Sequence, residues 1–276
     1  MILVTGTKRS GTSMWMQILK AAGLPIIGEP FVGVWESSIK EANPRGFFES
    51  RLRQGVFYGT NPNPETGAWL DPRTTRSHVV KVFIPGLVRT DFAYIDRVVA
   101  TMRPWREYGP SIDRLNALED AWFATQPDSE EKSRRERALR HRGRVPAWAE
   151  WWFETYELVR DVGTRRYPIH LTTYDRLLET PRESIRTTLE WLGSGDLEAA
   201  VVAVEPTLRT VTQGEDPPGL DLEAAALMDE IYRVVHNADE LKPALLAQMN
   251  ETQARLVQRF GAPSRERLRE DQDSPA

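Results

Sequence analysis

The chain has 276 residues, of which 36 are basic and 40 are acidic, and its formal charge at pH 7 is -4. Cysteine is absent, which excludes disulfides, thiol nucleophiles and thiolate metal sites. The slightly acidic balance argues against a nucleic-acid partner, because such proteins usually present a basic face. No apolar run reaches the roughly 18 residues that cross a bilayer, and residues 1–6 do not resemble a secretory signal. We therefore expect a cytoplasmic protein without a membrane span.

The first half of the chain alternates short apolar runs with loops. Residues 2–5 form a β-type run that ends at a glycine-rich turn, which predicts a strand. Apolar side chains at helical spacing then predict a helix over about residues 12–22. Residues 25–75 are rich in proline, glycine and asparagine, which indicates loops with short helices. The next two apolar runs stop at prolines and predict strands at residues 79–84 and 97–102.

Helical patterns dominate the second half, beginning with a helix predicted over residues 111–123. Residues 126–144 are the most charged stretch. We interpret this stretch as a solvated helix or a mobile excursion, with a lid over an anionic ligand as the alternative. Aromatic side chains at helical spacing indicate a helix over residues 148–162. The rest of the chain predicts one strand and three helices, at residues 168–172, 181–192, 222–236 and 244–260.

The order of these elements predicts the fold class. Strands that alternate with helices imply a central parallel β-sheet flanked by helices on both faces. We therefore expect a single α/β domain over residues 1–262. Residues 263–276 are charged and polar, and we expect a disordered tail there.

A phosphate-binding turn is predicted between the first strand and the first helix. Gly6 and Gly11 have the spacing of the two glycines of a Walker A loop, and glycines let successive N–H groups point at one anion. The N-terminus of the following helix adds its dipole and its free amides. The cations and hydroxyl donors of this loop are Lys8, Arg9, Thr12 and Ser13.

The lysine of a Walker A loop is missing from this turn, since Thr12 follows Gly11. A triphosphate with Mg²⁺ needs that lysine on its β- and γ-phosphates. The sequence therefore favours a donor that carries fewer charges and reacts without a metal, and we expect no metal site.

A second anion site is predicted where the strand at residues 97–102 ends. Arg103 leaves this strand, and Ser111, eight residues later, is expected to open the next helix. Ligands usually bind at this edge of a parallel sheet. The arginine and the serine could therefore share one phosphate group.

Together the two sites resemble those of the sulfotransferase family, whose donor is 3'-phosphoadenosine 5'-phosphosulfate (PAPS). Arg9-Ser10-Gly11-Thr12-Ser13 is similar to the arginine-type 5'-phosphosulfate loop of bacterial and Golgi-type members. Arg103 and Ser111 are similar to the 3'-phosphate motif in residue type and spacing. The resemblance covers about residues 1–215 and implies a P-loop-like nucleotide-binding fold.

Two further segments add to the resemblance. Residues 172–183, which include Tyr174, resemble a segment that contributes to the nucleotide pocket of the family. Residues 43–49 are similar to a segment seen in many bacterial members.

The chain also departs from the family pattern. Phe83 stands in place of the catalytic histidine of cytosolic members, and their adenine-stacking tryptophan falls on Met14, with Trp15 one residue later. The C-terminal Arg-Lys-Gly loop is not recognisable, and Arg209 is its nearest substitute. The resemblance therefore suggests further nucleotide contacts at Ser10, Met14, Trp15, Tyr174 and Arg209.

The resemblance implies transfer of a sulfuryl group from PAPS to a hydroxyl or amine of an acceptor, giving PAP and a sulfated product. Arg9 and Lys8 are then placed to stabilise the charge that grows on the leaving group. Two alternatives remain open: a P-loop kinase or other phosphotransferase, and a nucleotide-binding module without catalysis.

The general base is the least settled part of the prediction. Glu49 follows two phenylalanines, and such an apolar setting would strengthen a carboxylate as a base. His78, Glu36 and Glu29 are the alternatives.

The acceptor is expected to be a small molecule, and the sequence indicates neither its identity nor the oligomeric state. Aromatic residues gather in the loop-rich segment where family members place acceptor contacts, which suggests an apolar or aromatic compound. These residues are Trp35, Phe47, Phe48, Phe57, Tyr58 and Trp69.

Overall fold

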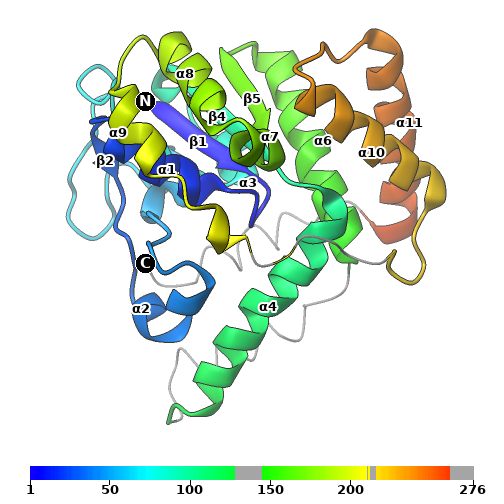
Figure 1. The fold of residues 1–276 in the computed structure, drawn as a ribbon, viewed down its shortest axis with the longest axis horizontal. Helices are drawn as coiled ribbons and strands as arrows, with labels where there is room; N and C mark the ends of the chain where they lie inside the picture. Colours follow the sequence, from blue (N-terminus) through cyan, green and yellow to red (C-terminus); the bar gives the residue numbers. More distant parts are fainter. Residues whose placement is uncertain (128–144, 210, 212–215, 262–276) are drawn as a thin grey trace.

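The computed structural model describes residues 1–127, 145–209, 211 and 216–261. This part of the chain contains a five-stranded sheet in which every strand is parallel to its neighbours, in the order β2-β3-β1-β4-β5 (Figure 1). The strands are β1 (Ile2–Gly6), β2 (Ile26–Ile27), β3 (Val79–Lys81), β4 (Arg97–Met102) and β5 (Ile169–Thr173). The predicted α/β class and parallel sheet are confirmed, whereas the two-residue strand β2 was too short to leave a pattern in the sequence.

Helices surround the sheet on both faces (Figure 1). The α-helices are α1 (Thr12–Ala21), α2 (Trp35–Ser38), α3 (Ile84–Arg89), α4 (Trp105–Ala124), α6 (Ala147–Arg165), α7 (Tyr174–Glu179), α8 (Pro181–Leu192), α9 (Leu197–Val202), α10 (Leu222–His236) and α11 (Pro243–Phe260). Single turns of 3-10 helix are η1 (Lys40–Ala42), η2 (Arg51–Gln54), η3 (Phe92–Tyr94) and η4 (Pro206–Leu208).

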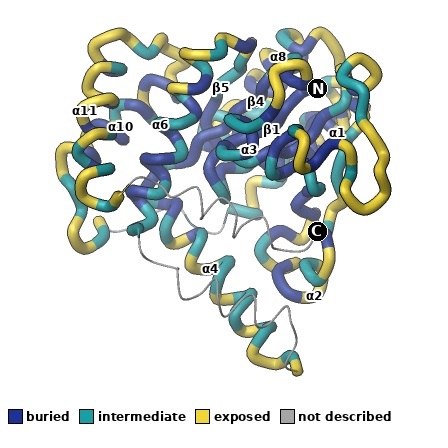
Figure 2. Tube along the Cα trace, turned by 180° about the vertical axis from the view of Figure 1, so that it is seen from behind, coloured by how far each residue is buried: buried dark blue, intermediate teal, exposed yellow. Residues whose placement is uncertain are grey.

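The central strand β1 is buried on both sides (Figure 2). Successive side chains of a strand point to opposite faces of the sheet. Ile2 and Val4 pack in one core with α1, α8 and α9, whereas Leu3 packs in another with α3 and α6. A strand covered in this way needs apolar residues at every position, which explains the unbroken apolar run at the start of the chain.

The aromatic stripe of α6 belongs to a third core, between α6, α10 and α11. Trp148, Trp151 and Trp152 are fully buried there and pack with residues of α10 such as Met228. These tryptophans therefore stabilise the fold by packing in its core.

The boundary predicted for the strand at residues 79–84 is wrong. The strand β3 ends at Lys81, and helix α3 begins at Ile84 with Pro85 in its first turn. Proline favours the first turn of a helix, because the N–H that it lacks would have no partner there. Phe83 therefore lies at the junction of β3 and α3 rather than inside a strand.

The start predicted for the helix at residues 111–123 is also wrong. Helix α4 begins at Trp105 and accommodates Pro110 in its interior. Ser111 therefore lies near the end of the second turn of α4 and does not open the helix. Arg103 and Ser111 are consequently separated by two turns of helix instead of by a loop.

The topology places a switch point of the chain at the carboxyl end of β1. The strand β1 lies between β3 and β4; the chain leaves β1 toward one side of the sheet and leaves β4 toward the other. Ligands usually bind at such a switch point in parallel sheets. The turn at residues 6–13 follows β1 and Arg103 follows β4, so both predicted anion sites lie at this point.

The remaining predictions concern the charged stretch, the C-terminal tail and a membrane span. Residues 128–144 and the tail at 263–276 lie outside the described residues, so the lid and the disordered tail stay predictions. Across the described ranges, every helix is too short or too polar to span a lipid bilayer.

Candidate functional site

The loop after β1 is narrow, and its two glycines are needed for different reasons. A Cβ atom added to Gly6 would lie 2.2 Å from the carbonyl oxygen of Thr101 on β4. Gly11 has a φ of 98°, and an added Cβ there would lie 2.6 Å from the ring of Tyr174. Glycine alone combines these close approaches with such backbone angles at little cost.

Hydrogen bonds from two hydroxyl groups to backbone oxygens stabilise the conformation of the loop. Ser10 Oγ donates a hydrogen bond to the carbonyl oxygen of Thr7 at 2.7 Å, and Thr101 Oγ1 donates to the carbonyl oxygen of Ser10 at 3.0 Å. Ser10 is fully buried. Its side chain therefore shapes the loop, and its hydroxyl proton is directed at the backbone rather than at a ligand.

Helix α1 begins directly after Gly11 without a side-chain cap. The first N–H groups of any helix have no acceptor within it, and together with the helix dipole they favour an anion. Thr12 is buried in this first turn, and Ser13 Oγ accepts a hydrogen bond from Lys81 Nζ at 3.1 Å. The loop thus directs the backbone donors of α1 toward the edge of the sheet.

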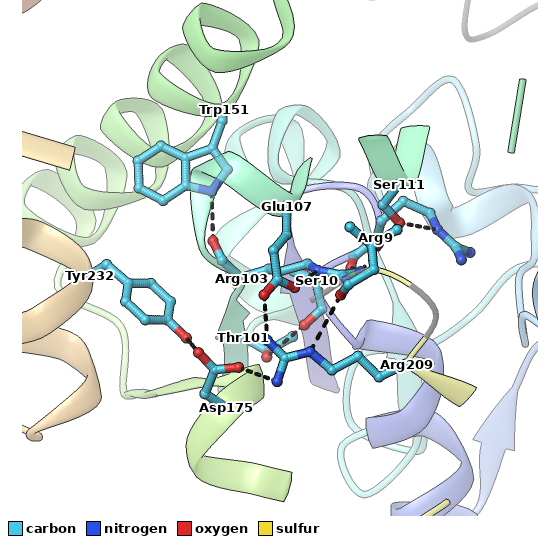
Figure 3. A network of polar contacts seen from close by, with 11 residues as sticks. Arg9, Ser10, Thr101, Arg103, Glu107, Ser111, Trp151, Asp175, Arg209 and Tyr232 are labelled. Atoms are coloured by element: carbon cyan, nitrogen blue, oxygen red, sulfur yellow. Dashed lines mark hydrogen bonds and ion pairs between the residues drawn. The ribbon is translucent and has the colours of Figure 1, made fainter. Parts of the chain in front are cut away.

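Arg9, Arg103 and Ser111 meet beside this loop (Figure 3). Arg9 Nε and Arg103 Nη1 each lie 3.2 Å from Ser111 Oγ and donate to it. Arg103 Nη1 also donates to the carbonyl oxygen of Arg9 at 3.1 Å. The side chains assigned from the sequence to two separate phosphate groups therefore form one continuous cluster.

Within the described residues, Arg9 has no carboxylate partner. Its guanidinium donates to two neutral oxygens, Ser111 Oγ and the carbonyl oxygen of Ala42, both at 3.2 Å. Burial, followed by the positive charge of Arg103, lowers the pKa of Arg9 to about 10. Arg9 also has a φ of 65°, a left-handed conformation that is unusual for a residue other than glycine. A cation held in this way would be stabilised by a bound anion.

Arg103, in contrast, is fixed by a carboxylate. Its Nε donates to Glu107 Oε2 at 2.8 Å, and its carbonyl oxygen accepts a hydrogen bond from Trp151 Nε1 at 2.9 Å. Arg209 also pairs with Glu107, and Arg209 Nη1 lies 2.8 Å from Asp175 Oδ1 (Figure 3). Alternating charges therefore join α4, α7 and the chain that follows η4.

Tyr174 packs against this arginine network. The guanidinium carbons of Arg103 and Arg209 lie 5.4 and 5.8 Å from the centre of its ring. Burial raises the pKa of the Tyr174 hydroxyl, although the nearby arginines oppose that effect. Tyr174 therefore stays neutral, and its ring supports the two cations through the electrons of its face.

Glu49 lies in a second buried cluster, near the first turn of α1. Lys81 Nζ is 2.8 Å from Glu49 Oε1, and Arg53 Nη1 is 3.1 Å from Glu49 Oε2. The three side chains are only 5–6% exposed. Burial lowers the pKa of Lys81, and its ion pair with Glu49 opposes that shift. The apolar setting that the sequence suggested for Glu49 is thus replaced by two cations.

Sequence reasoning missed Lys81, Arg53 and Glu107. Lys81 interrupts the apolar run at residues 79–84, and a single charge in a buried strand is a usable signal. Glu107 follows Arg103 by four residues, the spacing at which side chains on a helix pair. Arg53 gave no comparable signal, because it lies in the loop-rich segment.

The alternative bases lie apart from the loop or at the surface. Glu36 is exposed and pairs with a lysine one helical turn later. Glu29 is exposed and contacts Glu49 only through backbone hydrogen bonds of 2.9 and 3.1 Å. His78 precedes β3, and its carbonyl oxygen accepts a hydrogen bond from the N–H of Ile2. It therefore lies at the amino ends of the strands, whereas the loop lies at their carboxyl ends.

Several candidates taken from the resemblance belong to the core. Met14 and Trp15 are buried in the core that α1 forms with the sheet. The proposed acceptor contacts are divided, since Phe47 and Phe48 are buried whereas Tyr58 and Trp69 are exposed. Trp35 and Phe57 are half-buried.

Comparison with known proteins assigns no family to the chain. No family model matches the chain, and no curated protein is significantly similar to it. Among the described residues, no three histidine, aspartate or glutamate side chains are grouped so that they could hold a metal ion.

Proposed function

We propose that the protein is a sulfotransferase that moves a sulfuryl group from PAPS to a hydroxyl or amine of an acceptor, releasing PAP. One observation carries the proposal: Arg9 is half-buried, lies beside Arg103, and has only neutral partners in the described part of the chain. Burying a cation without a counter-ion is costly, and such a site gains from an anionic ligand.

The two ends of the cluster suit the two anionic ends of this donor. The amides at the start of α1, with Arg9 and Lys8, would hold the 5'-phosphosulfate, as anions are held at other helix N-termini. Arg103 and Ser111 would hold the 3'-phosphate, and Arg209 and Tyr174 would support Arg103. The sulfotransferase variant of the P-loop-like fold and a cytoplasmic location are part of the same proposal.

Positioning and electrostatics would supply most of the catalysis. Negative charge grows on the oxygen that joins sulfur to phosphorus as that bond breaks, and fixed donors there lower the barrier. Arg9 is suited to this role because its backbone and guanidinium are both held in place. Glu49 would accept the acceptor proton, and its ion pairs with Lys81 and Arg53 hold the carboxylate in place.

A phosphotransferase is the weaker alternative. It would require a lysine after Gly11 to contact a triphosphate, and Thr12 stands there, buried in the first turn of α1. A binding module without catalysis would keep the arginine cluster but would not need Glu49 beside the loop.

Thermal unfolding with nucleotides tests the proposal. PAP at 100 times its dissociation constant should stabilise the protein by about 2.7 kcal/mol without Mg²⁺, a rise in Tm of about 5–10 °C. ATP with Mg²⁺ should have no comparable effect. Stabilisation by ATP with Mg²⁺ but not by PAP would contradict the proposal, and absence of both effects would contradict both the sulfotransferase and the phosphotransferase. The Arg103→Ala variant is the matched control, since it should lose most of the PAP effect.

A further inference from the structure

Lys81 ends the buried strand β3 with a charged side chain. Val79 packs in the core that contains α1, whereas Val80 packs in the core that contains α3. Successive side chains of a strand point to opposite faces, so Lys81 lies on the same face as Val79, toward α1. In the sheet Lys81 pairs with Val4, two residues before the loop begins at Gly6. The strand therefore places an ammonium group beside the first turn of α1.

All three protons of this ammonium group have acceptors. A lysine side chain carries three donors and no acceptor. Lys81 Nζ donates to three oxygens, which are Glu49 Oε1 at 2.8 Å, Ser13 Oγ at 3.1 Å and the carbonyl oxygen of Phe47 at 3.2 Å. The Lys81 side chain is only 5% exposed. The three contacts therefore hold the ammonium group in one orientation.

The contact with Lys81 limits the directions in which the Ser13 hydroxyl can donate. A hydroxyl has one proton and two lone pairs, and a lysine ammonium cannot accept, so Ser13 Oγ accepts from Lys81 and its own proton points elsewhere. In the described part of the chain, no acceptor takes that proton. Ser13 is half-buried and is the second residue of α1, where the N–H groups also have no acceptor within the helix. An anion bound by these N–H groups would therefore also receive the proton of Ser13.

Lys81 also lies between the two buried charge clusters. Burial lowers the pKa of Lys81, its ion pair with Glu49 opposes that shift, and the positive charges of Arg9 and Arg53 lower the pKa further. The effect of Arg9 means that Lys81 is close to the arginine cluster as well as to Glu49.

Sulfuryl transfer needs groups on both sides of the sulfur atom. The acceptor oxygen forms a bond to sulfur while the bond between sulfur and the phosphate oxygen of PAPS breaks. As in phosphoryl transfer, these two oxygens lie roughly in line on opposite sides of the transferred group. The base acts on the first oxygen and the donors of the loop act on the second, so the distance between the base and the loop must be fixed.

We propose that Lys81 is a positioning residue that holds Glu49 and Ser13 at a fixed separation and directs the Ser13 proton to the 5'-phosphosulfate of the donor. The inference rests on the proposed sulfuryl transfer and assigns a role in it to Lys81. The acceptor proton passes to Glu49, and PAP leaves with the electron pair of the broken bond. Lys81 itself neither gains nor loses a proton, and it acts through the two side chains that it contacts.

Calorimetric titration with PAP tests this inference through a double-mutant cycle. Ser13→Ala should weaken PAP binding about tenfold, as expected for one lost hydrogen bond to a charged group. Lys81→Met should weaken it by at least a similar factor, because the Ser13 proton is no longer directed at the 5'-phosphate. In the Lys81→Met background, Ser13→Ala should cost only about twofold more, since the contact is already lost. A second loss of about tenfold there, or no effect of Ser13→Ala in the unaltered protein, would overturn the inference.

A second ligand and two further variants separate positioning from structural damage. Adenosine 3'-phosphate lacks the 5' group, so its binding should change by less than about twofold in every variant of the cycle. Ser13→Thr keeps the hydroxyl and should keep most of the PAP affinity. Lys20→Met removes one positive charge from the exposed far end of α1 and should leave PAP binding unchanged. Equal losses for PAP and adenosine 3'-phosphate in Lys81→Met would show a purely structural role and overturn the assignment.

Lys81→Arg replaces Lys81→Met in the cycle if the methionine variant does not fold. Arginine keeps a positive charge beside Glu49, but its planar donors do not match three acceptors that surround one nitrogen. Ser13→Ala should therefore again have little effect in this background. A full tenfold effect of Ser13→Ala there would contradict the role of Lys81.

Titration of the unaltered protein distinguishes failure of this inference from failure of the proposed function. If PAP does not bind to it, the sulfotransferase proposal fails, and the role of Lys81 fails with it. If PAP binds and the effect of Ser13→Ala does not depend on Lys81, the nucleotide site stands and the role of Lys81 is wrong.

Discussion

Two buried charge clusters border the first turn of α1, and they differ in how their charges are balanced. In one, Glu49 pairs with both Lys81 and Arg53 within 3.1 Å, so each cation has a carboxylate. In the other, Arg9 contacts only neutral oxygens among the described residues, beside a second arginine. A buried cation that pairs with a carboxylate of the protein can serve the stability of the fold alone. A cation without such a partner is more readily explained as part of a site for an anionic ligand. This contrast can be tested directly.

The largest effect on stability should come from the balanced cluster. Lys81→Met leaves Glu49 buried beside one cation instead of two and should lower the free energy of unfolding by about 3 kcal/mol. Arg9→Met removes a cation that has no carboxylate partner in the described residues and should change it by less than about 1 kcal/mol. Urea denaturation of both variants measures the difference. Similar losses would mean that Arg9 is also neutralised by the protein and would remove the main support for an anion site.

Replacing Glu49 should have the next largest effect. Glu49→Gln keeps the shape of the side chain but cannot accept the acceptor proton, so kcat should fall at least about 100-fold. PAP should still bind, because Glu49 is not part of the arginine cluster. Steady-state kinetics and calorimetry measure the two quantities, with the exposed Glu36→Gln as the control. Full activity of Glu49→Gln would show that Glu49 is not the base.

Arg9 should act more on the rate than on binding. Arg9→Ala should lower kcat about 100-fold, the low end for loss of one transition-state donor, and weaken PAP binding much less. Arg9→Lys should recover part of the rate, since one charge remains. Unchanged turnover at saturating substrates would show that Arg9 only positions the loop.

Arg103 should instead determine the choice of nucleotide. Arg103→Ala should weaken PAP binding by about 2 kcal/mol, as expected for a lost charge-assisted contact. Adenosine 5'-phosphosulfate lacks the 3'-phosphate, so its binding should change far less. Calorimetric titration with both ligands decides the point, and equal losses would contradict the assignment of Arg103 and Ser111.

The smallest effect concerns the glycine that joins the loop to α1. Gly11→Ala combines a positive φ with a contact to the Tyr174 ring and should destabilise the protein by about 2 kcal/mol. Gly23 has a φ of 88° with no atom within 4 Å of an added Cβ, so Gly23→Ala measures the backbone cost alone, about 1 kcal/mol. Equal losses of stability in Gly11→Ala and Gly23→Ala would show that the Tyr174 ring moves aside without a cost in free energy.

Local patterns in the sequence were sufficient for the class of the fold. Apolar runs that end at glycine or proline predicted three of the five strands in the described residues, and the run at 168–172 predicted a fourth. A strand buried on both faces, such as β1, needs apolar side chains throughout. The glycine spacing at Gly6 and Gly11 likewise predicted the position of the loop. Boundaries were less well predicted, since Pro110 lies inside α4 although proline usually disfavours the interior of a helix.

Only the tertiary structure decided which charges meet. Arg9 and Ser111 are 102 residues apart, and Lys81 and Glu49 are 32 apart, so no local pattern connects either pair. The sheet order places β3 and β4 on either side of β1, and this brings Lys81 and Arg103 to the same loop from different parts of the chain. A sequence shows which residues carry charge, but the free energy of a buried charge depends on its neighbours, and those neighbours come from the fold.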